Sequence, residues 1–155
     1  MASWRSAYEG LIDRSFLDAM RAEEQAARWH TTITRHGHSS CVFVAEEADG
    51  TVAGFASGGR ERDLDRQYLG ELYSLYLLPA CQRRGLGSQL LRAVAGWLHQ
   101  HRMDSMLVWV LRDNLPARSF YEHHGGGFLR ATRRQLLEIE FEEVSYGWLD
   151  TSPIR

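Results

Sequence analysis

The stretch Glu71-Leu-Tyr-Ser-Leu-Tyr-Leu-Leu-Pro-Ala-Cys-Gln-Arg-Arg-Gly-Leu-Gly87 decides the fold. Its first half is an almost unbroken run of apolar or strand-favouring residues, which predicts a buried strand over 72–78 that Pro79 stops. Its second half predicts a helix start that binds phosphate, because Gly85 and Gly87 precede apolar residues at four-residue spacing: Leu90, Val94 and Leu98. A helix start has unpaired N–H groups, and glycines let a phosphate approach them closely.

Two common phosphate-binding motifs are excluded at this loop. A nucleoside-triphosphate P-loop ends in Gly-Lys-Ser/Thr, and the chain contains no lysine. A dinucleotide-binding fingerprint needs a third glycine where this chain has Leu90. The pattern that remains is Gln82-x-x-Gly85-x-Gly87 directly after a strand.

Length and composition indicate an ordinary globular protein. The 155 residues suit a single domain over 1–155, and 44% hydrophobic with 25% charged residues are typical globular values. A net charge of -2 is not a nucleic-acid footprint, and no apolar run reaches the roughly 18 residues of a membrane span. Two cysteines fit a reducing compartment. We therefore expect a cytoplasmic protein without a nucleic-acid or membrane partner.

The first half of the chain predicts helices and then a hairpin. Residues 3–35 have helical composition, and two β-prone segments, 41–45 and 52–57, flank a turn at Asp49-Gly50. Residues 58–70 are rich in glycine and charge, which is typical of an exposed loop. Its charged side chains are expected to be solvated: Glu61, Arg62, Asp63, Asp65 and Arg66.

The second half predicts a parallel strand, a short helix and an antiparallel pair. Residues 106–111 are a continuous apolar run, so strand, glycine loop, helix and strand form a right-handed βαβ unit. Asn114 is placed to cap a helix that Gly125 ends. Residues 128–149 alternate in two segments, which indicates a closing pair of strands.

Two motifs at this separation resemble the GNAT superfamily of N-acetyltransferases. The glycine loop is similar to the family's acyl-CoA pyrophosphate loop. The family pattern Asn-x-x-Ala-x-x-Phe/Leu-Tyr-x-x-x-Gly-Phe is matched in register by Asn114, Ala117, Phe120, Tyr121 and Gly125. The resemblance is good over about residues 70–130 and weaker at Trp4, Tyr8 and Gly10, which match an early family motif. Gly126 and Gly127 intervene before Phe128, so the entry to the next strand is expected to be looser than usual.

The resemblance implies an α/β fold with one mixed sheet, helices on both faces, and central parallel strands, 72–78 and 106–111, that splay apart. Family members usually open with a strand before the first helix, whereas this chain starts at the expected helix. The family's first strand is therefore missing, or a partner chain, as in a homodimer, covers the open sheet edge.

The resemblance also implies acetyl-CoA as co-substrate and a set of site residues. The pantetheine arm would lie beside Leu75 to Leu77, with the Leu77 N–H as oxyanion donor, and the loop amides would hold the pyrophosphate. Arg83, Arg84 or Arg118 can meet the phosphates. The implied cofactor-binding residues are Leu75, Tyr76, Leu77, Gln82, Arg83, Arg84, Gly85, Leu86, Gly87, Ser88, Asn114, Ala117, Arg118 and Tyr121.

Two side chains are candidates for proton transfer. Glu71 can accept the amine's proton through a water, or it is an ordinary carboxylate at a strand end. Tyr121 can protonate the departing thiolate, or it is a core aromatic beside a core Phe120. Three close histidine pairs lack the partners of a zinc site, so we expect exposed histidines and no metal: His36 and His38, His99 and His101, His123 and His124.

Two functions stay open at this point. The first is an N-acetyltransferase that moves an acetyl group from acetyl-CoA to a primary amine of a small molecule or peptide by direct attack. The second is a non-catalytic acyl-CoA-binding regulatory module that keeps the phosphate loop without turnover. Glu71 and Tyr121 favour the enzyme.

Overall fold

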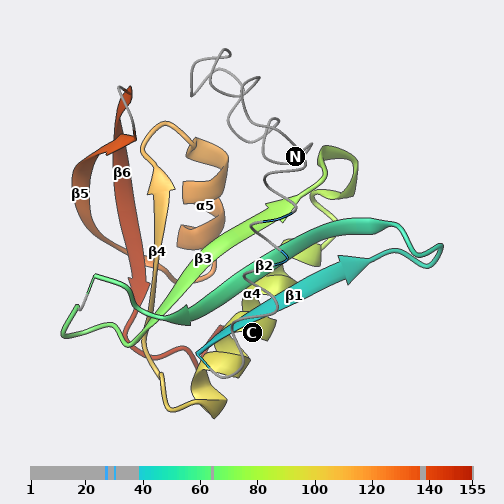
Figure 1. The fold of residues 1–155 in the computed structure, drawn as a ribbon, viewed down its shortest axis with the longest axis horizontal. Helices are drawn as coiled ribbons and strands as arrows, with labels where there is room; N and C mark the ends of the chain where they lie inside the picture. The colour runs from blue at the N-terminus through green and yellow to red at the C-terminus, as the bar shows by residue number, and fades with distance from the viewer. Residues whose placement is uncertain (1–26, 28–29, 31–38, 64, 137–138, 155) are drawn as a thin grey trace.

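The fold is a six-stranded mixed sheet with the strand order β1-β2-β3-β4-β6-β5 (Figure 1). The structure is a computed structural model that describes residues 27, 30, 39–63, 65–136 and 139–154. The elements are β1 Ser40–Glu46, β2 Val52–Arg60, β3 Gly70–Leu77, a 3-10 helix η1 Pro79–Cys81, α4 Leu86–Gln100, β4 Met106–Leu111, α5 Leu115–His123, β5 Gly127–Leu136 and β6 Ile139–Trp148. Of the helices expected over 3–35, the described residues include only Ala27 and His30, which are helical; Trp4, Tyr8 and Gly10 lie outside them, as does any strand before these helices.

The first hairpin is confirmed. β1 and β2 pair antiparallel around a turn in which Gly50 has a φ of 85° and the Asp49 carboxylate accepts the Thr51 N–H at 2.9 Å. A positive φ suits glycine because it has no Cβ. β2 continues to Arg60, beyond the expected end at residue 57.

Helix α4 packs on the sheet through the face that the sequence predicted. Leu90, Val94 and Leu98 are all buried, with at most 4% of their surface exposed. They lie at four-residue spacing on one side of the helix and cover β1, β2 and β3. The packing of this apolar stripe fixes the position of the glycine loop at the end of β3.

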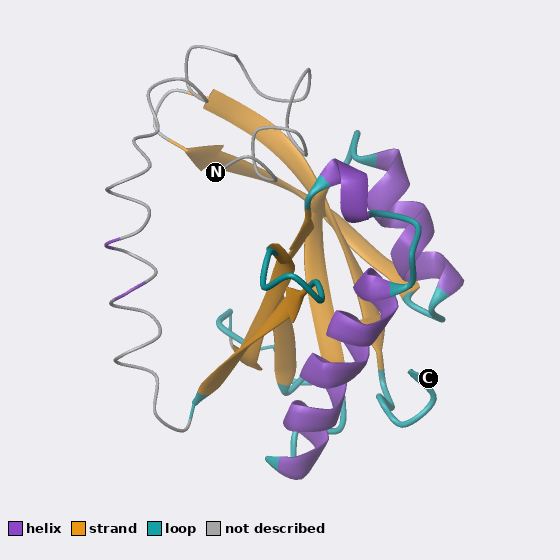
Figure 2. Ribbon diagram, turned by 90° about the vertical axis from the view of Figure 1, so that its right-hand side faces the viewer, coloured by secondary structure: helices purple, strands orange, loops and turns teal. Residues whose placement is uncertain are grey.

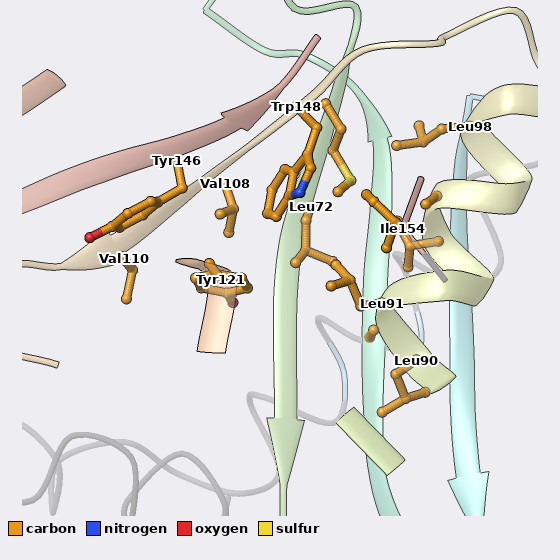
Figure 3. Packing of buried hydrophobic residues seen from close by; sticks show 14 of the residues in the cluster. Leu72, Leu90, Leu91, Leu98, Val108, Val110, Tyr121, Tyr146, Trp148 and Ile154 are labelled. Carbon is orange, nitrogen blue, oxygen red and sulfur yellow. The ribbon is translucent and has the colours of Figure 1, made fainter. Parts of the chain in front are cut away.

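One hydrophobic core joins the helices α4 and α5 to the same face of the sheet. Leu72 of β3 and Val108 of β4 are register partners, and both belong to a cluster with Leu91 of α4 and Tyr121 of α5. Figure 2 shows α4 and α5 on one side of the sheet, and Figure 3 shows the clustered side chains. None of the described helices is long and apolar enough to cross a membrane.

The parallel strands β3 and β4 separate after three paired residues. Pairing runs from Gly70 with Met106 to Leu72 with Val108, and the next residue, Tyr73, is a bulge against β2. A bulge bends its strand and increases the local twist. Figure 1 shows β3 and β4 diverging toward their arrowheads, and with the short pairing this confirms the predicted splay.

The prediction of an exposed, solvated loop over 58–70 is only partly correct. Residues 58–60 belong to β2 and Gly70 to β3. Between them, Glu61 is only 6% exposed, and its carboxylate accepts the backbone N–H groups of Asp63 and Asp65 at 2.8 and 2.7 Å. Ion pairs from Asp63 and Asp65 to Arg134 and Arg130 tie the segment to β5, while Arg62, Asp63 and Arg66 are exposed as expected.

The glycines before β5 form a packed turn instead of a loose entry. Gly125 has a φ of 81°, and the Gly126 N–H donates to the Tyr121 carbonyl at 2.9 Å. A Cβ on Gly126 would lie 2.8 Å from the Trp148 ring, so the turn accepts only glycine there without displacement. The extra length is absorbed by this turn and by a bulge at Leu129 in the β5–β6 pairing.

Candidate active site

A cleft of about 1230 Å³ lies where β3 and β4 diverge and extends to the first turns of α4 and α5. It brings together the two motifs that are about 30 residues apart in the sequence. The expected site residues that line it are Glu71, Leu75, Tyr76, Leu77, Gln82, Arg83, Gly85, Gly87, Ser88, Asn114, Ala117 and Tyr121.

The glycine loop forms a cradle at one end of this cleft. Gly85 is the N-cap residue of α4, has a φ of 84°, and makes no side-chain cap to the helix. The first turn of α4 carries no acidic residue, so its N–H groups are available to an anion. A Cβ on Gly87 would lie 3.3 Å from the Phe120 ring and 3.5 Å from Leu77, which leaves the backbone closely approachable only with glycine.

The backbone of β3 supplies hydrogen-bond donors along the cleft. The Leu78 N–H donates to the Ala53 carbonyl of β2 at 2.8 Å. Because N–H directions alternate along a strand, the N–H groups of Leu75 and Leu77 point away from β2, toward the side where β4 departs. The Gln82 side chain donates to the Leu77 carbonyl at 3.4 Å and so links the loop to the strand.

Helix α5 contributes Asn114, Phe120 and Tyr121. The Asn114 side chain accepts the Ala117 N–H at 3.2 Å, which confirms the predicted N-cap. Tyr121 is 6% exposed and lies near Trp148 in the core, with ring centroids 6.2 Å apart, while it also lines the cleft (Figure 3). Phe120 is not a fully buried core residue as expected; it is half-buried and lines the same cleft.

A histidine connects the two helix ends at the cradle. The His124 ring lies with one nitrogen 2.8 Å from the Ser88 hydroxyl and the other 2.8 Å from the Phe120 carbonyl. His124 is therefore half-buried and bonded, in contrast to the exposed histidine expected, whereas His99, His101 and His123 are exposed. Its two bonds fix Ser88 relative to α5.

Three of the expected binding residues are not part of the cleft lining. Arg84 pairs with the Glu47 carboxylate at 2.5 and 3.1 Å, on the side of the first hairpin. Arg118 donates to the Tyr146 hydroxyl at 3.0 Å and to a backbone carbonyl at 2.8 Å. Leu86 opens α4 and is half-buried. Among the arginines proposed for phosphate contact, Arg83 is the one that lines the cleft.

Glu71 lies at the closed end of the cleft, where β3 and β4 are still paired. Its side chain is buried, and its two oxygens accept from the Arg62 guanidinium at 3.0 and 2.5 Å and from the Arg62 N–H at 3.2 Å. The hydrogen bond to Glu71 raises the pKa of Arg62. The guanidinium also lies 4.4 Å from the centre of the Tyr73 ring. A water that takes a proton to Glu71 must share the carboxylate with Arg62.

Five residues that line this end of the cleft were not predicted from the sequence. They are Arg62, Asp63, Trp109, Arg134 and Glu143. Arg62 and Asp63 were assigned to a solvated loop, and Arg134 and Glu143 come from strands that pair only through the completed sheet. The sequence holds one signal for Glu143 in the cleft: in an alternating strand, Glu143 lies on the same face as the small residues Ser145 and Gly147.

Comparison with known proteins decides the family. Residues 4–126 match the Acetyltransferase (GNAT) family. The chain belongs to this family. This acetyltransferase is 35% identical over 153 residues to the uncharacterized N-acetyltransferase YuaI of Bacillus subtilis (strain 168), covering 99% of the chain and 85% of YuaI. The resemblance inferred from the two motifs is confirmed, and the chain is an acyltransferase.

Solved structures share the fold of this acetyltransferase. PaiA N-acetyltransferase of Thermoplasma acidophilum, solved in complex with coenzyme A, has a TM-score of 0.65 at 19% identity, covering 95% of this chain and 87% of that one. YncA of Salmonella typhimurium, solved with acetyl-CoA as its cofactor, has a TM-score of 0.65 at 22% identity, covering 86% and 77%. Among the residues described for this chain, no group of three or more His, Cys, Asp or Glu could hold a metal ion.

Proposed function

We propose that this acetyltransferase moves the acetyl group of acetyl-CoA to a primary amine of a small molecule or peptide by direct attack. The observation that carries the proposal is the cleft itself. It joins a glycine cradle for an anion to a buried carboxylate, with strand N–H donors facing the space between them.

The cradle fits the pyrophosphate of CoA. The Gly87 backbone can be approached closely, and the α4 N–H groups and Arg83 supply positive charge. The pantetheine arm would then follow β3, pairing with the N–H groups of Leu75 and Leu77, and the amide of Asn114 would bond it from the other side. The thioester would reach the closed end of the cleft, between Tyr121 and Glu71.

The reaction needs a nucleophile, an oxyanion site, an acid and a base. The nitrogen lone pair of the neutral amine attacks the thioester carbonyl, a C–N bond forms, and the Leu77 N–H donates to the carbonyl oxygen as it becomes negative. When the C–S bond breaks, Tyr121 gives a proton to the departing thiolate. The proton lost by the amine passes through a water to Glu71. No covalent enzyme intermediate is required.

A turnover assay tests the proposal directly. The protein is mixed with acetyl-CoA and a panel of primary amines, and free thiol is followed together with the mass of the acetylated amine. Thiol release that depends on an amine supports the transferase. Tight CoA binding with no amine-dependent thiol release would favour the non-catalytic binding module.

Replacing Glu71 tests the proton acceptor. We expect Glu71→Gln to lower kcat by about tenfold or more, since a general base contributes up to about 10⁴-fold and water can partly replace it. CoA affinity should stay unchanged, because the cradle is at the opposite end of the cleft. Initial rates with amines of different pKa provide the measurement.

The dependence on the acceptor separates chemistry from structure. Amines of low pKa are already deprotonated, so they should lose less activity in the Glu71→Gln variant. A loss that is equal for every amine would mean that Glu71 acts only by holding Arg62.

A further inference from the structure

The end of the cleft beside β6 has an imbalance of charge. Three carboxylates, Asp63, Glu71 and Glu143, line it together with two guanidinium groups, Arg62 and Arg134. They come from β3, β6, β5 and the segment between β2 and β3, so the tertiary fold gathers them. With every group ionised, this end carries one more negative than positive charge.

Two of the three carboxylates are well paired. Glu71 accepts from Arg62 at 2.5 and 3.0 Å, and Asp63 accepts from Arg134 at 2.8 Å. Glu143 has only the second contact of Arg134, at 3.4 Å, as its ion pair within the described residues. This distance is longer than a good charge-assisted hydrogen bond, which is about 2.7–2.9 Å. The unmatched negative charge therefore belongs to Glu143.

The surroundings of Glu143 favour a cation at this carboxylate. Its side chain is 22% exposed, so it is enclosed but still reaches the cleft. Burial raises the pKa of Glu143, and the charge of Glu71 adds to the rise, while Arg134 and Arg62 oppose it. A cation that enters the cleft would stabilise the ionised carboxylate.

From this geometry we infer that Glu143 pairs with a positively charged nitrogen of the acceptor and so selects amines that carry a second cationic group. The inference rests on the proposed function. The amine that attacks must be neutral, because its lone pair forms the new bond. The cation at Glu143 is therefore another nitrogen of the same molecule, and the acceptor class is a diamine or longer polyamine.

Two matched acceptors and two matched variants test this inference. The acceptors are 1,5-diaminopentane and pentylamine, which have the same carbon chain and differ in the second nitrogen. The variants are Glu143→Gln and Glu142→Gln. Glu142 is the adjacent residue of β6 and pairs with Arg112 and Arg133, so it controls for the loss of one carboxylate on the same strand.

The wild-type protein should use the diamine at least about tenfold better in kcat/KM than the monoamine, which corresponds to one charge-assisted contact. Glu143→Gln should remove this preference by raising KM for the diamine about tenfold with kcat within about twofold, as expected for lost binding. Glu142→Gln should keep the preference. Glu143→Asp should restore part of it, and thermal unfolding should show that each variant is folded.

Equal use of the two acceptors by the wild type would overturn the inference and leave the transferase intact. A preference for amines that carry a carboxylate would also overturn it, since Arg62 or Arg134 would then bind the acceptor. If none of the amines in the panel caused thiol release, the proposed function would be overturned as well. The two failures are therefore distinguishable.

Discussion

Gly87→Glu is expected to lower the affinity for CoA at least about 100-fold, or about 2.7 kcal/mol. Gly87 is buried in the first turn of α4, and a Cβ there already lies 3.3 Å from the Phe120 ring. A glutamate would place a longer side chain against Phe120 and Leu77 and a negative charge beside the N–H groups that we assign to the pyrophosphate. Calorimetric titration with CoA measures the change.

Gly96→Glu is the matched control for this prediction. Gly96 lies on the same helix, and a Cβ there would meet no heavy atom within 4 Å. The substitution adds the same charge to α4 without reaching the cleft, so CoA affinity and the melting temperature should stay close to the wild type. If the well-folded Gly87→Glu protein bound CoA as tightly as the Gly96→Glu protein, the cradle would be wrongly assigned.

Tyr121→Phe is expected to lower kcat about 100-fold, because general-acid catalysis typically contributes about 10²–10⁴-fold. The change removes one oxygen and little volume, so the ring contacts with Phe120 and Trp148 are kept. CoA affinity and folding should be nearly unchanged. Steady-state rates at saturating acetyl-CoA, with the best acceptor from the amine panel, give the measurement.

Tyr146→Phe controls for the loss of a tyrosine hydroxyl in the same core. Tyr146 is fully buried, donates to Glu122 at 2.6 Å and accepts from Arg118 at 3.0 Å. Its substitution should therefore cost about 1–3 kcal/mol of stability, because two hydrogen bonds to charged side chains are lost, with little effect on kcat. A Tyr121→Phe protein that behaves in the same way, less stable but equally fast, would return Tyr121 to a packing role.

The elements that the sequence predicted well are those with local signals. The run that ends at Pro79, the stripe of Leu90, Val94 and Leu98, and the N-cap at Asn114 each depend on neighbours within a few residues. These signals placed the glycine loop and α5 in the chain. The two motifs then met in the structure because β3 and β4 lie side by side.

The features that the sequence did not predict depend on contacts between distant segments. Glu61 is buried because it folds the following residues around its own carboxylate, which composition cannot reveal. Glu143 and Arg134 reach the cleft only when β5 and β6 complete the sheet. Arg84 was expected at a phosphate, but its partner Glu47 is 37 residues away in the sequence. Charged residues have no periodic pattern that would disclose such pairings.

Because of the bulge at Tyr73, the opening between β3 and β4 depends on a single extra residue in β3. Ser57 faces Ser74 and Gly58 faces Leu72, so Tyr73 is the single residue without a counterpart on β2. Ser57 and Gly58 are adjacent on β2, so Leu72 and Ser74 already lie on opposite faces of the sheet, and deleting Tyr73 would keep both registers while removing the bend. A single-codon deletion could thus convert a sheet with a substrate cleft into a continuous one, whereas most point substitutions on β3 would leave the opening in place.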